Sequence, residues 1–190
     1  MLLHASHRLI AISATLIVAA SGPALAQEAT ALFEPIRSVL QHPRCQNCHI
    51  PGEAPLQYDS GTPHAQNVQR NVDGRGMPAM ECASCHTSAN SPASYGAHAP
   101  PGAPNWHLPP RATKMVFIGL SSRELCMVLK DGSTNGGKSL AQLDTHMSED
   151  KLVGWGWKPG GERTVPPITR EKLSAAFKTW VKAGAPCPPG

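Results

Sequence analysis

The chain carries one short pattern of cysteine and histidine twice, and this pattern can bind a metal cofactor covalently. The pattern is Cys-x-x-Cys-His, and it occurs at Cys45, Cys48 and His49 and again at Cys82, Cys85 and His86. In such a motif the two thiols add across the vinyl groups of a haem, and the adjacent histidine becomes the proximal ligand of the iron. Two copies predict two covalently attached c-type haems.

Paired cysteines have three other uses in proteins besides haem attachment. Four thiolates could hold one zinc ion, but the interval between the pairs exceeds that of zinc ribbons, and zinc does not explain the histidine after each pair. Two thioredoxin-like motifs would each need a βαβ context that this chain lacks. A disulfide within each pair would close too short a loop to stabilise much. Haem attachment is therefore the expectation.

The far side of each iron needs a ligand, and five further histidines follow residue 26. They are His42, His64, His98, His107 and His146. His64 follows Pro63 on a stiffened loop and is the first choice for a distal ligand. His107 follows Trp106, which can pack on a porphyrin face, and His146 shares a helical face with apolar residues. The distal candidates are His64, His107 and His146.

Methionine is the competing distal ligand, because haem irons accept either histidine or methionine. Met77 and Met80 directly precede the second motif, and Met147 follows it. Met115 and Met127 are expected in the hydrophobic core instead. A histidine–methionine pair would raise the reduction potential relative to two histidines, so the ligand affects the direction of electron flow.

The two remaining cysteines, Cys126 and Cys187, are expected to form a disulfide. Both lie in the C-terminal half, far apart in the sequence. Thiols oxidise in an exported protein, and a bond between them would close the C-terminal part of the chain. The alternative is a buried Cys126 in a helix and a free Cys187 near the tail.

The N-terminal residues predict export. A weakly basic start precedes the apolar run Leu9–Ala20, which is short for a membrane span. The tripeptide Ala-Leu-Ala that ends at Ala26 fits the small-x-small cleavage signal, so residues 1–26 are expected to be a cleaved signal peptide. A retained N-terminal anchor is the alternative. Cleavage implies a periplasmic protein without an integral membrane segment in its mature chain.

Composition indicates a loop-rich chain that needs a cofactor to fold around. The 190 residues include 19 prolines and 17 glycines, which is more than ordinary usage and lacks a collagen period. The net charge of +4 comes from scattered lysines and arginines with few aromatic residues between them. This pattern does not indicate nucleic-acid binding.

Helical patterns lie at the two ends of the mature chain. The expected helices are Phe33–Leu40, one that begins at Ser121 and stops at Asp131-Gly132, Lys138–Met147, and one that begins at Thr169 and ends at Gly184. Pro35 suits the first turn of the first helix, Ser121 opens a capping box, and Thr169 caps the last helix, which Gly184 ends.

Loops are expected to fill the middle of the chain. Pro51–Met80 and Ser88–Pro110 are rich in residues that favour turns. Met115–Leu120 is a short apolar run that could be a strand or a helix. No stretch has a clear hairpin signal.

These elements predict a mainly α, loop-rich fold with one domain over residues 27–190. Residues 27–110 carry the two haem-attachment motifs, and residues 111–190 form a helical part that packs over the haems. The mature chain before the second motif is too short for a complete single-haem cytochrome fold, so two tandem copies do not fit.

The paired motifs at Cys45–His49 and Cys82–His86 resemble those of small exported di-haem c-type cytochromes. Three segments, HPRCQNCH, GAPNWHLPP and LVGWGWKPG, are also similar to those of short cytochrome-like proteins labelled as subunits of isoquinoline 1-oxidoreductase. The first resemblance implies an electron relay between a dehydrogenase and a terminal acceptor. The second implies a periplasmic molybdenum hydroxylase as the electron donor, with this chain as the carrier.

An electron carrier is therefore the expected function, and no catalytic residue is assigned. The rival is a small di-haem peroxidase or reductase with one open iron, in which Trp155, Trp157 and Arg163 would line a distal pocket. A haem-based sensor or a structural subunit is a third reading. An exchangeable sixth ligand would favour the enzyme, and two closed irons would favour the carrier.

Overall fold

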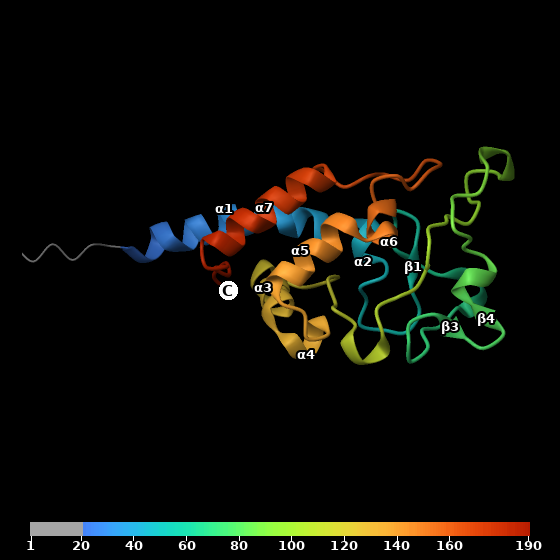
Figure 1. Cartoon of the computed structure of the whole chain (residues 1–190), viewed down its shortest axis with the longest axis horizontal. Helices are drawn as coiled ribbons and strands as arrows, with labels where there is room; N and C mark the ends of the chain where they lie inside the picture. The colour runs from blue at the N-terminus through green and yellow to red at the C-terminus, as the bar shows by residue number, and fades with distance from the viewer. Residues whose placement is uncertain (1–20) are drawn as a thin grey trace, which may run out of the picture.

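The computed structural model describes residues 21–190, which form a mainly helical, loop-rich structure (Figure 1). Its α-helices are α1 (Ser21–Leu40), α2 (Pro43–Gln46), α3 (Ser122–Lys130), α4 (Gly132–Asn135), α5 (Leu140–Glu149), α6 (Lys151–Trp155) and α7 (Arg170–Lys182). Single 3-10 turns are η1 (Ala65–Asn67), η2 (Cys82–Ser84), η3 (Ala93–Tyr95) and η4 (Arg111–Thr113). The expected mainly α, loop-rich fold class is confirmed.

The hydrophobic core lies between the longer helices. Helix α1 packs on α3 and α7, and α5 packs on α7. Phe33 of α1 and the α7 residues Phe177 and Trp180 are fully buried, and the Trp180 ring lies 5.5 Å from Phe33 and 5.2 Å from Phe177. Figure 1 shows these helices gathered on one side of the molecule and the central loops on the other.

Side-chain caps explain where the helices of the C-terminal half begin. Ser121 and Ser139 each form a complete capping box, at α3 and α5. The Thr169 side chain accepts a hydrogen bond from the Lys172 N–H at the start of α7. Each cap satisfies backbone N–H groups that the first helical turn leaves free. The predicted starts at Ser121 and Thr169 are confirmed.

The predicted start of the first helix is wrong. Helix α1 already runs from Ser21, and Pro35 lies inside it. The residues before Pro35 are mostly good helix formers, and Ala29, Phe33 and Ile36 are all buried along one side of the helix. Burial of that side outweighs the backbone hydrogen bond that Pro35 cannot donate.

The predicted signal peptide, residues 1–26, lies mostly outside the described residues, as does the whole of its apolar run. Within residues 21–190, no helix combines the length and the hydropathy needed to cross a bilayer.

The central loops contain two very short antiparallel strand pairs. Strand β1 (Leu56–Gln57) pairs with β2 (Thr62–Pro63), with Leu56 opposite Pro63. Strand β3 (Gly76–Met77) pairs with β4 (Met80–Glu81), with Met77 opposite Met80. The sequence gives no hairpin signal at either place, because two-residue strands are too short to show an alternating pattern.

Two further predictions differ from the structure. Met115–Leu120 is neither strand nor helix. This segment lies beside the first motif, and the Phe117 N–H donates to the His49 carbonyl. Met127 lies on the outer side of α3 and is about half exposed, so it is not a core residue.

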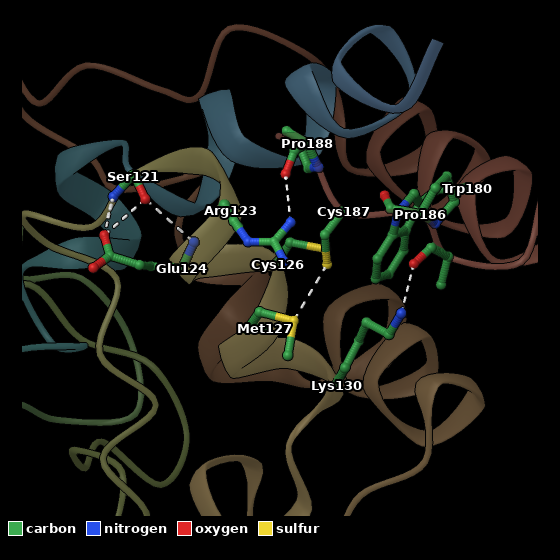
Figure 2. Close-up of a disulfide and its surroundings, with 11 residues drawn as sticks. Ser121, Arg123, Glu124, Cys126, Met127, Lys130, Trp180, Pro186, Cys187 and Pro188 are labelled. Atoms are coloured by element: carbon green, nitrogen blue, oxygen red, sulfur yellow. Dashed lines mark hydrogen bonds between the residues drawn. A yellow bond between two sulfur atoms is a disulfide. The ribbon is translucent and has the colours of Figure 1, made fainter. Parts of the chain in front are cut away.

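The predicted Cys126–Cys187 disulfide is confirmed. The two residues lie 61 positions apart in the sequence, and their Cα atoms are 5.6 Å apart. Figure 2 shows Cys126 on α3 and Cys187 on the tail that follows α7. Cys126 is fully buried, so the bond ties this tail directly to the core.

Three hydrogen bonds to tail carbonyls supplement the disulfide (Figure 2). Lys130 Nζ donates to the Ala185 carbonyl at 2.8 Å, Trp180 Nε1 donates to the Pro186 carbonyl at 2.9 Å, and Arg123 Nη1 donates to the Pro188 carbonyl at 3.3 Å. These bonds fix the tail against α3 and α7 even though it has no regular secondary structure.

Loss of this disulfide should destabilise the chain. Cys126→Ala combined with Cys187→Ala is expected to lower the free energy of unfolding by about 2–4 kcal/mol, because the bond closes a long loop in the unfolded chain. Urea unfolding followed by circular dichroism measures the change. Dithiothreitol should produce the same loss in the parent chain and none in the double variant. An unchanged parent midpoint after reduction would contradict this role.

Candidate haem-binding sites

The first motif begins on α2 and continues as a turn. Pro43 occupies the first turn of this helix, and the His42 side chain caps it by accepting from the Arg44 N–H. The N–H groups of Cys48 and His49 both donate to the Cys45 carbonyl, at 3.2 and 3.3 Å. The two thiols and the imidazole are thereby held on one tight stretch of backbone.

The second motif has the same hydrogen-bond pattern on a 3-10 turn. Its first residues form η2, and the N–H groups of Cys85 and His86 donate to the Cys82 carbonyl, at 3.2 and 2.9 Å. The Cys82 N–H donates to the Arg75 carbonyl at 2.9 Å, so the β3–β4 hairpin positions the start of the motif. Two segments with different sequence surroundings thus share one hydrogen-bond pattern, in which the last two N–H groups of the motif donate to the carbonyl of its first cysteine.

The four motif cysteines are free thiols. Cys82 is buried, Cys45 and Cys48 are partly buried, and Cys85 is exposed. Burial raises the pKa of Cys45 to about 12 and that of Cys48 to about 11, so both are protonated at neutral pH. The alternative of a structural disulfide within each motif is therefore not formed.

The zinc alternative also lacks geometric support. Over residues 21–190, no three side chains of the histidine, cysteine, aspartate or glutamate type come together as a metal cage would require. A structural zinc site needs four such ligands in a tetrahedron.

Both motif histidines present the same ring nitrogen. His49 Nδ1 lies 2.8 Å from the Met115 carbonyl oxygen, and His86 Nδ1 lies 2.7 Å from the Pro101 carbonyl oxygen. A carbonyl oxygen can only accept, so each Nδ1 carries the proton and donates it. Each Nε2 therefore keeps its lone pair, and this is the arrangement found for histidines that ligate metals.

An aromatic ring stacks on each of these imidazoles and fixes its plane. The His49 and Phe117 ring centroids are 3.9 Å apart at 11° between planes, and those of His86 and Trp106 are 4.4 Å apart at 3°. The Phe117 N–H also donates to the His49 carbonyl at 2.9 Å. Burial lowers the pKa of His49 to about 4, which keeps its imidazole neutral.

His64, the first distal candidate, lies close to the second motif. Its ring centroid is 6.1 Å from that of His86, with 67° between the planes. His64 Nδ1 donates to the Ala65 carbonyl at 2.7 Å, so its Nε2 also keeps a lone pair. The His64 N–H donates to the Pro55 carbonyl at 2.9 Å, which extends the β1–β2 pairing and fixes the loop.

The other two distal candidates, His146 and His107, lie on α5 and directly after Trp106, respectively. His146 is partly buried on α5, and its charge would help to lower the pKa of His49. His107 is near enough to His146 to act on its pKa in the same way, and its Nδ1 donates to the Asn105 carbonyl at 2.5 Å. Neither ring stacks on His49.

The two histidines outside the candidate set have other contacts. His42 caps α2, and its Nε2 lies 3.3 Å from the Thr164 hydroxyl. His98 is exposed and its ring meets the edge of Tyr58, with the centroids 5.1 Å apart.

The residues proposed to line an enzyme-like pocket are engaged in structural contacts. Trp157 Nε1 donates to the Ile168 carbonyl at 2.8 Å, and Arg163 Nη2 donates to the Ala99 carbonyl at 2.7 Å. The Trp155 ring packs edge-on to Trp106 with the centroids 4.8 Å apart. Through that contact, α6 supports the second motif.

Three of the residues that support the motif histidines carry no specific signal in the sequence. Met115 and Pro101 contribute backbone carbonyls, and any residue type can do so. Phe117 carries only the general signal of an aromatic residue in an apolar run. A buried arginine, Arg70, was also missed, because it lies in a stretch that has every sign of an exposed loop.

No protein-family model, curated protein or solved structure matches this chain. The assignment of these sites therefore depends on the two motifs and on the geometry around them.

Gly102 tests the contact that holds His86. A methyl group at this position would lie 2.0 Å from the Ala89 carbonyl oxygen, so the backbone beside Pro101 would have to move. Gly102→Ala is expected to lower the free energy of unfolding by about 2 kcal/mol or more. It should also weaken the downfield proton resonance of His86 Nδ1–H.

Gly52→Ala is the matched control, because its added methyl group meets nothing within 4 Å. It should leave both the stability and the resonance unchanged. An equal response in the two variants would show that the Pro101 contact has no special role.

Proposed function

We propose that this chain is an exported electron-transfer protein that carries two c-type haems in one domain. Cys45 and Cys48 would hold the first haem and Cys82 and Cys85 the second. The proximal ligands would be His49 and His86. A bound haem supplies one-electron exchange at its iron, and the chain supplies attachment, ligands and exclusion of water.

One observation carries this proposal. Both motif histidines donate Nδ1–H to a backbone carbonyl, at 2.8 and 2.7 Å, and both stack on an aromatic ring. Thiol redox motifs have no need for such an arrangement. A proximal haem ligand does, because the second hydrogen bond sets its tautomer and increases its basicity. Both motifs show this arrangement, although the carbonyl and the aromatic ring come from different residues at each.

The position of His64 supports a closed iron at the second haem. The ring centroids of His64 and His86 are 6.1 Å apart, and the Nδ1 of each ring donates to a backbone carbonyl, so each Nε2 is free to ligate. His64 would therefore be the second histidine ligand of the haem that Cys82 and Cys85 would hold. An iron with two histidine ligands exchanges electrons without opening a site for substrate, which favours the carrier over the peroxidase or reductase.

His146 and His107 remain the distal candidates for the first haem. Both are within electrostatic range of this site, directly or through each other. Among the methionines, Met115 lies beside the first motif, where its backbone carbonyl accepts the hydrogen bond from His49 Nδ1. The C-terminal helical part would cover this haem.

The partner would be a redox protein in the periplasm that donates or accepts electrons. The resemblance to cytochrome-like subunits of isoquinoline 1-oxidoreductase favours a molybdenum hydroxylase as the donor. Exposure of Cys85 supports docking near the second haem, because electron transfer between proteins needs a cofactor edge close to the surface.

Removal of either cysteine pair should remove one haem. Cys45→Ala with Cys48→Ala, and separately Cys82→Ala with Cys85→Ala, are expected to reduce the covalent haem content from two per chain to one. The pyridine haemochrome spectrum, divided by the protein concentration, measures it. Cys126→Ala with Cys187→Ala is the control and should retain two. A parent protein without covalent haem would refute the proposal.

Removal of the His64 side chain should open the second iron. His64→Ala is expected to give a high-spin electron paramagnetic resonance signal and a ferrous form that binds carbon monoxide. His98→Ala is the matched control, because His98 is exposed on a neighbouring loop, and it should remain low-spin. If His64→Ala also stayed low-spin and bound no carbon monoxide, another residue would be the ligand.

A further inference from the structure

Arg70 is a fully buried arginine that lies beside the first haem-attachment motif. Its side chain has no exposed surface, although it belongs to the loop between the two motifs. Two backbone bonds fix the residue: its N–H donates to the Glu53 carbonyl at 2.7 Å, and its carbonyl accepts from Arg111 Nη2 at 3.0 Å. The side chain is therefore held in place.

The Arg70 guanidinium is largely unpaired. Nη2 donates to the Cys48 carbonyl at 3.3 Å, while Nε and Nη1 are buried without a hydrogen-bond partner. Over the described part of the chain, no carboxylate lies within ion-pair distance of this group. Glu53 is the carboxylate with the largest electrostatic effect on Arg70, and it already contacts Lys114 at 2.7 Å and Arg111 at 3.5 Å.

This group cannot lose its charge. A guanidinium remains protonated in proteins even where burial lowers its pKa, as it does for Arg70. A charge without a partner in the interior is poorly screened, so its field acts more strongly on nearby groups than that of a surface charge. Cys48, which would carry one thioether of the first haem, is the residue that the guanidinium touches.

The other charges near the two motifs are paired with a carboxylate or are more exposed than Arg70. Arg44 is also buried beside the first motif, but it forms an ion pair with Asp59. Near the second motif, Asp73 and Glu81 oppose the charge of Arg75, and Asp73 and Arg75 have side chains more than half exposed. Arg163 also acts on His86, but it is only partly buried and its guanidinium donates to the carbonyls of Pro159, Gly160 and Ala99. The fully buried and largely unpaired guanidinium therefore lies at the first site.

We infer that Arg70 raises the reduction potential of the first haem above that of the second. Ferric haem carries one more positive charge than ferrous haem, so a buried cation beside it disfavours the ferric form. This inference rests on the proposed function, and it makes Arg70 a tuning residue that does not ligate the iron.

Potentiometric titration of the two-haem protein, followed by absorption, tests the inference. The parent should show two separate midpoint potentials. The variant Cys82→Ala with Cys85→Ala, which keeps the first haem, should show the higher one. Arg70→Met should lower this potential and narrow the separation, whereas Arg70→Lys, which keeps the charge, should largely preserve it. Removal of an unpaired buried charge is compatible with folding.

Two further variants separate the charge of Arg70 from a general disturbance. Lys182→Met removes an exposed cation at the end of α7, outside both motifs, and should move neither potential. Glu53→Gln removes the nearest negative charge and should raise the higher potential, opposite to Arg70→Met. It also provides a test if Arg70→Met fails to fold.

The outcomes are distinguishable. If both haems are attached and Arg70→Met leaves the higher potential unchanged, or lowers only that of the second haem, the inference is overturned and the electron-transfer proposal stands. If Glu53→Gln lowers the higher potential, the inference is likewise overturned. If no covalent haem is present, the proposed function itself fails.

Discussion

The central constraint in this structure is the hydrogen bond from each motif histidine to a backbone carbonyl. It decides which imidazole nitrogen is free, and therefore whether the histidine can bind a metal. Neither carbonyl is local: His49 uses Met115, and His86 uses Pro101. The loops that carry these carbonyls must be ordered, although they have little regular secondary structure. The close packing at Gly102, where no side chain fits, is one consequence.

The helices provide the rigid base from which these loops extend. Helix α1 is buried along one side in the core and ends just before the first motif, so the position of that motif is set by the packing of Phe33 and its neighbours. The segment after η4 runs back along the same motif through the bond between Phe117 and His49. The disulfide and the caps secure the remaining helices, and Trp155 of α6 reaches across to Trp106 beside the second motif.

Features that depend on local residue chemistry could be predicted from the sequence. The capped starts at Ser121 and Thr169 follow from side chains that bond the nearest backbone, and the Cys126–Cys187 pair follows from the absence of other partners for two oxidisable thiols. Features that depend on packing could not. The upstream extension of α1 past Pro35 is an example, because burial there overrides a local signal. The carbonyls of Met115 and Pro101 carry no mark in the sequence at all.

The most direct test is the intact mass of the parent chain after expression in a host that matures c-type cytochromes, measured under denaturing conditions. The account predicts a chain that begins at Gln27 and is heavier by two haems, since only thioether-linked haem survives denaturation. Two haems on a chain with a different start would contradict only the cleavage site. A mass without added haem would contradict the central claim and would mean that the four motif cysteines act as thiols.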